Sequence, residues 1–293
     1  MSPAESSTPE QSAPYSGPSA GETGPAGLNP KRVRTVHLQR FKDEGRRFSM
    51  LTAYDAMMAE VLDDAGVEVL LIGDSAANVM QGRASTLSIT VEEMIIYASS
   101  VVNGARRALV VADLPFGSYE ASPEQAVASG VRLMKEAGVH AVKVEADATL
   151  VPHVRAMVSA GIPVMAHIGF TPQSEHALGG YRVQGRGEAK QRLMETAEAL
   201  VEAGAFSLLV EMVPAEVMAE LDAAVPVPTV GIGAGASATG QVLVWQDMLG
   251  LNGGRLPRFV KQYADLRGII TEAVGRFRDD VASGAFPAEE HTF

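Results

Sequence analysis

Acidic residues, one lysine and one histidine stand directly after apolar segments of this sequence, one segment after another along the chain. In order they are Asp55, Asp74, Asp113, Lys143 with Glu145, His167 and Glu211. If the apolar segments are parallel strands of a barrel, their carboxyl ends converge on one mouth, where barrel enzymes carry their catalytic groups. Carboxylates gathered there repel one another unless a cation lies among them, so the pattern predicts a divalent metal site. Taken singly, each residue has a simpler interpretation as a polar strand end that reaches water.

Lys143 and Glu145 are the most informative pair. They are two residues apart in an apolar segment, so on a strand their side chains point to the same side. If that side is the interior of a barrel, both charges are removed from water, which is unfavourable unless they are paired or bound to a ligand. A structural ion pair and a ligand-binding pair are therefore both open.

Glu211 follows the apolar run Ser207–Val210. A carboxylate beside an apolar wall can have a raised pKa and act as a general base near neutral pH. Alternatively, it only accepts a hydrogen bond from a neighbouring loop. His167 is the one histidine that we expect in the site, because the sequence has no HExxH motif and no histidine pair at helical spacing.

The elements that would position these residues alternate between apolar runs and amphipathic stretches. The expected strands are Phe48–Thr52, Val67–Gly73, Ala108–Ala112, Ala141–Val144, Pro163–His167, Ser207–Val210, Thr229–Ile232 and, less clearly, Val242–Trp245. The expected helices are Ala56–Asp64, Val91–Val102, Pro123–Glu136, Leu150–Ser159, Glu188–Glu202 and Ala215–Ala223. Near-continuous Val, Ile and Leu is typical of parallel strands buried on both faces.

Several helix ends are marked in the sequence. Thr90 and Glu93 fit a capping box, Ser122 precedes a proline at the first helical position, and glycines that fit left-handed caps follow four helices. The repeated β/α units favour an α/β fold of the (β/α)8 TIM-barrel type. An open doubly wound sheet remains the alternative.

Two glycine-containing segments have less specific interpretations. The run from Gly231 to Gly235 follows the seventh strand, where barrels often bind phosphate, but it is no GxGxxG motif and lacks the lysine of a P-loop. Close approach to a ligand and a simple tight turn are both open for it. The segment from Gly179 to Gly187 is a candidate mobile loop or lid.

Composition excludes several classes of protein. The chain has 293 residues, with 24 Lys and Arg against 35 Asp and Glu and a net charge of -11, which argues against nucleic-acid or anionic-membrane partners. There is no cysteine, so disulfides, thiolate nucleophiles and cysteine metal sites are excluded. Any metal must be held by oxygen or histidine nitrogen, which favours magnesium-like chemistry.

Domain organisation is simple. Residues 1–30 are rich in Pro, Ser and Gly, and we expect a disordered N-terminal tail there, followed by a single barrel domain over residues 31–293. No apolar stretch is long enough to cross a bilayer and no secretory signal is visible, so we expect a cytoplasmic protein.

The sequence also resembles the ketopantoate hydroxymethyltransferase family over residues from about 35 to about 285. The motifs that carry the resemblance occur in order: Leu51-Thr52-Ala53-Tyr54-Asp55, Gly73-Asp74-Ser75, Gln81-Gly82, Ala112-Asp113-Leu114-Pro115-Phe116, Val142-Lys143-Val144-Glu145, His167-Ile168-Gly169-Phe170-Thr171-Pro172-Gln173-Ser174, Gly179-Gly180-Tyr181, Gln184-Gly185-Arg186, Glu211 and Gly231–Gly235. Ten ordered motifs are far more specific than any one of them.

The resemblance implies a (β/α)8 barrel enzyme of pantothenate biosynthesis. Such enzymes transfer a one-carbon unit from 5,10-methylenetetrahydrofolate to 3-methyl-2-oxobutanoate with magnesium, giving 2-dehydropantoate. The implied residue roles, motif by motif, are metal binding by Asp74 and Asp113 with support from Glu145, substrate binding by Asp74, Ser75, Asp113 and Lys143, proton abstraction by Glu211, and pocket lining by Tyr54 and His167. The resemblance further implies a homo-oligomer, a decamer.

One segment departs from the family pattern. Ala236-Ser237-Ala238-Thr239-Gly240 differs from the Asp-Gly-Gln ending associated with the family, so folate affinity is in question if this loop touches the folate. Two other functions are alternatives. One is a relative within the phosphoenolpyruvate mutase and isocitrate lyase group, although its lyases use a cysteine acid that this chain lacks. The other is a barrel that binds keto acids or folates without turnover.

Overall fold

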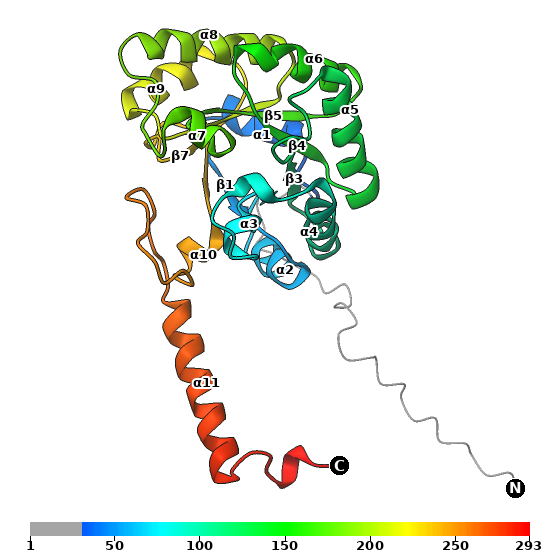
Figure 1. Ribbon diagram of the computed structural model, residues 1–293, viewed down its shortest axis with the longest axis vertical. Helices are drawn as coiled ribbons and strands as arrows, with labels where there is room; N and C mark the ends of the chain where they lie inside the picture. The colour runs from blue at the N-terminus through cyan, green and yellow to red at the C-terminus, as the bar shows by residue number, and fades with distance from the viewer. Residues whose placement is uncertain (1–30) are drawn as a thin grey trace, which may run out of the picture.

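The computed structural model describes residues 31–293, and the tail expected over residues 1–30 lies outside the described residues. Eight parallel strands form a closed barrel in chain order, so the TIM-barrel prediction is confirmed and the open sheet is excluded (Figure 1). The strands are β1 (Phe48–Thr52), β2 (Val69–Ile72), β3 (Leu109–Asp113), β4 (Ala141–Glu145), β5 (Val164–Gly169), β6 (Ser207–Glu211), β7 (Thr229–Ile232) and β8 (Gly240–Leu243).

Helices surround the barrel on its outer side (Figure 1). The longer ones are α2 (Ala56–Asp64), α4 (Val91–Gly104), α5 (Pro123–Arg132), α6 (Val151–Ser159), α8 (Glu188–Glu202) and α9 (Ala215–Ala224). Short helices α3 (Ala76–Val79), α7 (Glu175–Leu178) and α10 (Trp245–Met248) lie in loops after strands, while α1 (Thr35–Asp43) precedes β1 and α11 (Leu266–Ser283) follows the barrel. No helix of residues 31–293 is long and apolar enough to cross a membrane.

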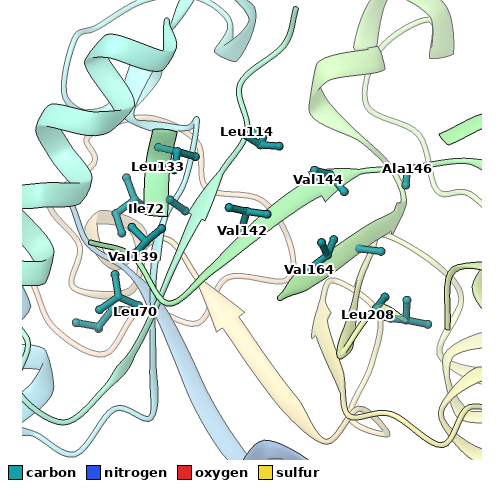
Figure 2. Packing of buried hydrophobic residues seen from close by; sticks show 14 of the residues in the cluster. Leu70, Ile72, Leu114, Leu133, Val139, Val142, Val144, Ala146, Val164 and Leu208 are labelled. Carbon is teal, nitrogen blue, oxygen red and sulfur yellow. The ribbon is translucent and has the colours of Figure 1, made fainter. Parts of the chain in front are cut away.

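Strand alternation divides the core into two parts. Side chains that point outward, such as Leu70, Val142 and Leu208, pack beneath the helices in a large apolar cluster (Figure 2). Side chains that point inward, such as Met50 and Leu109, fill the barrel together with residues from α1. Because parallel strands are buried on both faces, this arrangement explains their near-continuous apolar sequences.

The inward positions change from apolar to polar toward the carboxyl ends of the strands. In β4 the inward sequence is Ala141, Lys143 and Glu145, and in β6 it ends with Leu209 and Glu211. The register pairs Asp113 with Lys143, and it pairs Glu145 with His167. The strand-end residues are therefore brought into one layer of the barrel by pairing and alternation alone.

The remaining sequence predictions hold in part. The caps at Thr90 and Ser122 are present, but the eighth strand runs from Gly240 to Leu243, and Trp245 begins α10 instead of ending the strand. Gly240 weakens the apolar pattern, yet the ring of Phe48 lies so close that a Cβ there would meet it at 2.5 Å. The helix expected up to Glu136 ends as a π-helical turn over Leu133–Ala137.

Five helices of residues 31–293 were not expected from the sequence, namely the short α3, α7 and α10 and the longer α1 and α11. In α1 the residues are mainly polar and charged, and only Leu38 and Phe41 are buried. In α11 no residue is buried, and Figure 1 shows the helix projecting away from the barrel. Apolar side chains such as Ile269 and Phe277 remain exposed along it. Without a dense apolar stripe facing the core, neither α1 nor α11 has a strong helical pattern.

Gly169 controls how close β5 lies to β6 beside Glu211. Its φ is +93°, and a Cβ at this position would lie 2.3 Å from the Glu211 carbonyl oxygen. We expect Gly169→Ala to destabilise the protein by more than about 2 kcal/mol, because the left-handed backbone alone costs about 1–2 kcal/mol and β6 must also move. The measurement is urea unfolding.

Gly161→Ala is the matched control. Its φ is +85°, but a Cβ there would meet nothing within 4 Å. We expect only the backbone cost of about 1–2 kcal/mol for this variant. Equal destabilisation by the two substitutions would show that the contact with Glu211 is unimportant.

Candidate active site

A cavity of about 310 Å³ lies at the carboxyl ends of the strands. Its deep end is apolar and includes Leu71, Leu209 and Val242. Its polar wall brings together most of the residues singled out in the sequence, namely Asp74, Ser75, Asp113, Lys143, Glu145, His167 and Glu211. A mostly apolar pocket with a few converging polar groups is the usual form of a small-molecule site.

Two sequence candidates lie outside this lining. Tyr54 is buried behind Ser75, and its hydroxyl lies 2.9 Å from the Ser75 Oγ. Tyr54 therefore does not line the cavity itself but hydrogen-bonds Ser75, which does. Asp55 caps α2 by accepting a hydrogen bond from the Met58 backbone N–H, so its carboxylate has a structural role.

Lys143 is the central cation of the site, with only 4% of its surface exposed. Its Nζ lies 3.1 Å from Asp113 Oδ1 and 3.3 Å from His167 Nδ1. Burial alone lowers the pKa of Lys143, but Asp113, Glu145 and Asp74 raise it more, so the ammonium stays protonated. Lys143 therefore pairs directly with Asp113, and Glu145, the partner expected from the sequence, acts on the ammonium as one of several nearby charges.

His167 is neutral in this environment. Burial and then the Lys143 ammonium hold the pKa of His167 well below its usual value. Since Lys143 can only donate, we assign Nδ1 as the acceptor and place the ring proton on Nε2. His167 Nε2 lies 3.3 Å from Glu211 Oε2, which is close, though the two atoms lack the alignment of a full hydrogen bond.

Glu211 ends β6 with its carboxylate in the cavity wall. Burial raises its pKa to about 8, against a smaller lowering by Lys143 and with further raising by Asp74 and Asp113. Met212, the next residue, has a φ of +48°, the one positive φ of a non-glycine among residues 31–293. Its backbone is fixed on both sides, because its N–H donates to Ile232 and its carbonyl accepts from Gln184. Local backbone strain of this kind often accompanies functional groups.

The carboxylates of Asp74, Asp113 and Glu145 act electrostatically on the Lys143 ammonium. Asp113 Oδ2 accepts from the Asp74 backbone N–H at 3.0 Å. Burial raises the pKa of Asp74, raises that of Asp113 to about 7, and raises that of Glu145 well above its usual range. Three buried carboxylates and the partly exposed carboxylate of Glu211 therefore share one ammonium, and an additional cation would stabilise their ionised forms.

The oxygen donors of this group suit a hard divalent cation. Glu145 Oε1 is buried and has no hydrogen-bond partner, and Asp113 Oδ1 has only its ion pair with Lys143. No three Asp, Glu or His side chains of the described part of the chain form a complete metal cluster. The residues fit Mg²⁺, which is commonly bound through one or two carboxylates with substrate oxygens and water completing its shell.

Gln173 and Tyr119 are site residues that the sequence did not single out. Gln173 donates from its side chain to Asp74 and from its backbone to Glu145, while the Tyr119 hydroxyl donates to the Gln173 amide oxygen. Both residues also line a second cavity of about 390 Å³, which shares Glu145 with the first. The only signal in the sequence was the place of Gln173 in a family motif after β5, since a polar residue in a loop has no distinctive pattern.

The outer part of the first cavity is formed by loops. Tyr181, from the candidate lid segment, stacks on Phe170 with ring centroids 4.7 Å apart and lines the cavity. Phe259 lies against the glycine run, because a Cβ at Gly233 would meet its ring at 2.8 Å. The run from Gly231 to Gly235 therefore makes a turn that packs closely against Phe259.

Comparison with known proteins identifies close relatives. A family model described as ketopantoate hydroxymethyltransferase matches residues 32–289. The 3-methyl-2-oxobutanoate hydroxymethyltransferase of Paenarthrobacter aurescens is 60% identical, covering 99% of this chain and 98% of its own length. The enzyme of the same name from Arthrobacter sp. is 59% identical, covering 97% and 96%.

Solved structures with a similar fold are more distant in sequence. The phosphoenolpyruvate phosphomutase of Streptomyces platensis subsp. rosaceus superposes with a TM-score of 0.58 at 16% identity, covering 86% of this chain and 88% of its own. At this identity the likeness concerns the fold alone.

The raised carboxyl pKa values predict how stability depends on pH. The pKa of Glu211 is about 8 and that of Asp113 about 7, against 4.5 and 3.8 for the free groups. The folded protein therefore binds more protons than the unfolded chain over this range, so the metal-free protein should lose stability as pH rises from 5 to 8. Thermal unfolding across this range measures the slope.

Added Mg²⁺ should raise the melting temperature more at pH 8 than at pH 5, because it binds ionised carboxylates. Glu211→Gln should flatten the metal-free slope. A melting temperature that is constant from pH 5 to 8 without metal would contradict the assigned charge states.

Proposed function

The chain belongs to the ketopantoate hydroxymethyltransferase family, and we propose that it transfers a hydroxymethyl group from 5,10-methylenetetrahydrofolate to 3-methyl-2-oxobutanoate, forming 2-dehydropantoate. It is thus an enzyme of the one-carbon transferase type. The observation that carries the mechanism is the row of contacts from Asp113 through Lys143 and His167 to Glu211. These contacts connect the proposed cation-binding group, Asp74, Asp113 and Glu145, to the proposed base Glu211 across one cavity.

Asp74 and Asp113 would hold Mg²⁺, with Glu145 supporting it through water. When bound, the metal acts as a Lewis acid toward the carbonyl and carboxylate oxygens of the 2-keto acid. Ser75 lies beside Asp74 in the cavity wall, and its Oγ is positioned by Tyr54 to hydrogen-bond the substrate. Lys143 supplies positive charge on the side where negative charge develops in the reaction.

Glu211 would accept the proton from C3 of the keto acid. The C3–H bond breaks, and its electron pair forms the new C–C bond to the methylene carbon. The two C–N bonds that hold this carbon to the folate break, and water adds the hydroxyl oxygen. The two nitrogens of the released tetrahydrofolate take up the proton from C3 and one proton from water. A pKa of about 8 in the empty pocket makes Glu211 a stronger base than an exposed glutamate. His167 Nε2 lies 3.3 Å from Glu211 Oε2, and its proton would stabilise the carboxylate electrostatically.

We also propose the wider setting that the family implies. The chain would act in the cytoplasm in pantothenate and coenzyme A biosynthesis, through one catalytic domain over residues 31–293. It would work as a homo-oligomer, a decamer by the family resemblance. The exposed apolar side chains of α11, including Ile269 and Phe277, support association with further subunits.

Deuterium exchange at C3 of 3-methyl-2-oxobutanoate, followed by NMR, tests the first half of this reaction without folate. We expect exchange that depends on Mg²⁺, and a loss of at least about 100-fold in Glu211→Gln, because the amide cannot accept the proton. Calorimetry should show that this variant still binds the keto acid. Glu198→Gln, on the exposed side of α8, is the matched control and should exchange like the wild type.

Unchanged exchange in Glu211→Gln would reject Glu211 as the base. If the wild type shows no exchange with metal, the experiment is repeated with tetrahydrofolate. Continued absence of exchange would reject the proposed reaction in favour of a barrel that binds without turnover.

A further inference from the structure

Gln173 lies in the short 3-10 turn Pro172–Ser174 after β5 and contacts two of the carboxylates in the site. Its side-chain Nε2 donates to Asp74 Oδ2 at 2.9 Å, and its backbone N–H donates to Glu145 Oε2 at 2.8 Å. Only 6% of its surface is exposed. One residue therefore anchors two acids that come from the ends of different strands.

The orientation of the Gln173 amide is determined by its partners. Nε2 lies 2.9 Å from Asp74 Oδ2 and 3.0 Å from the Leu114 carbonyl oxygen, and the carbonyl can only accept, so the amide nitrogen must lie on this side. The amide oxygen must then face Tyr119, whose hydroxyl donates to it at 2.6 Å. Tyr119 is itself buried, with 2% exposed. All hydrogen-bonding positions needed to fix the amide are filled.

These hydrogen bonds fix the orientation of the Asp74 and Glu145 carboxylates. Gln173 occupies Oε2 of Glu145, and Oε1 stays buried without a hydrogen-bond partner. It also occupies Oδ2 of Asp74, so that carboxylate cannot turn freely about its own bond. Two acids that repel each other are thus kept in a fixed arrangement by neutral donors, and no charge of the cation-binding group is cancelled by doing so.

We propose that Gln173, oriented by Tyr119, is a positioning residue that fixes Asp74 and Glu145 for binding of the divalent cation. This inference rests on the metal requirement in the proposed function. Gln173 acts through Asp74 and Glu145 and does not contact the substrate. Groups that hydrogen-bond metal ligands in this way commonly change metal affinity by about 10–100-fold when they are removed. Pro172 restricts the backbone of the same turn, which limits movement of Gln173.

The test measures Mn²⁺ binding to the full-length, substrate-free protein. Electron paramagnetic resonance gives the concentration of free Mn²⁺ during the titration. Gln173→Leu removes the side-chain donors and keeps the backbone bond to Glu145. We expect it to weaken Mn²⁺ binding by about 10–100-fold. Tyr119→Phe removes the hydroxyl that orients the amide and that also lies 3.1 Å from the Glu145 carbonyl oxygen, but it keeps the donors of Gln173, so a smaller loss is expected. Gln191→Leu, at an exposed glutamine of α8 that bonds only Glu195, is the control and should bind like the wild type.

A second readout separates positioning from general stability. Thermal unfolding without metal reports the stability of each variant. If Gln173 has a purely structural role, its variant should melt at a lower temperature. Its Mn²⁺ affinity, measured at temperatures well below the melting temperature, should then equal that of the wild type. In the complete reaction, positioning predicts a higher Mg²⁺ concentration for half-maximal activity, with most of kcat recovered at saturating metal.

Wild-type Mn²⁺ affinity in folded Gln173→Leu would overturn the inference while leaving the proposed function intact. If Gln173→Leu does not fold, Tyr119→Phe decides, and wild-type affinity in that variant overturns the inference. If the wild type binds no Mn²⁺, the metal requirement of the proposed function fails and the inference fails with it.

Discussion

One ammonium group, that of Lys143, lies at the level of the barrel where inward-facing side chains change from apolar to polar. Burying a single lysine there would be strongly unfavourable, and burying three carboxylates without it would be worse. The Lys143 ammonium keeps Asp113 close, determines the tautomer of His167 and so directs a ring N–H toward Glu211. The apolar layer beneath it, which includes Leu71 and Leu209, keeps water from screening these charges.

The barrel supplies this arrangement with little specialised structure. Parallel pairing brings Asp113, Lys143, Glu145 and His167 to neighbouring strands, and alternation turns all four inward. Asp74 and Ser75 come from the segment directly after β2, and the groups that refine the positions of the carboxylates come from loops farther along the chain. Gln173 and Tyr119 lie in segments after β5 and β3, where side chains can reach across the strand ends to the carboxylates.

The strands and the layer of charged residues could be predicted because their signals are local. An apolar run shows a buried strand, and a two-residue spacing shows that Lys143 and Glu145 share a side. The hydrogen-bond network could not be predicted in this way. The contact between Gln173 and Asp74 joins residues 99 positions apart in the sequence, and nothing in either segment specifies it. Likewise, α11 packs against no core in the single chain, so the amphipathic pattern that predicts most helices is weak there.

The strained backbone of Met212 lowers thermal stability while it holds the peptide next to Glu211 in one conformation. Glycine would adopt its φ of +48° without the penalty that a side chain brings, and would therefore be favoured wherever heat resistance alone is selected. The same exchange would give the peptide after Glu211, the proposed base, more conformational freedom at its position opposite His167. An engineering programme that ranks variants of this enzyme only by resistance to heat would thus accept a change that slows the proposed proton removal.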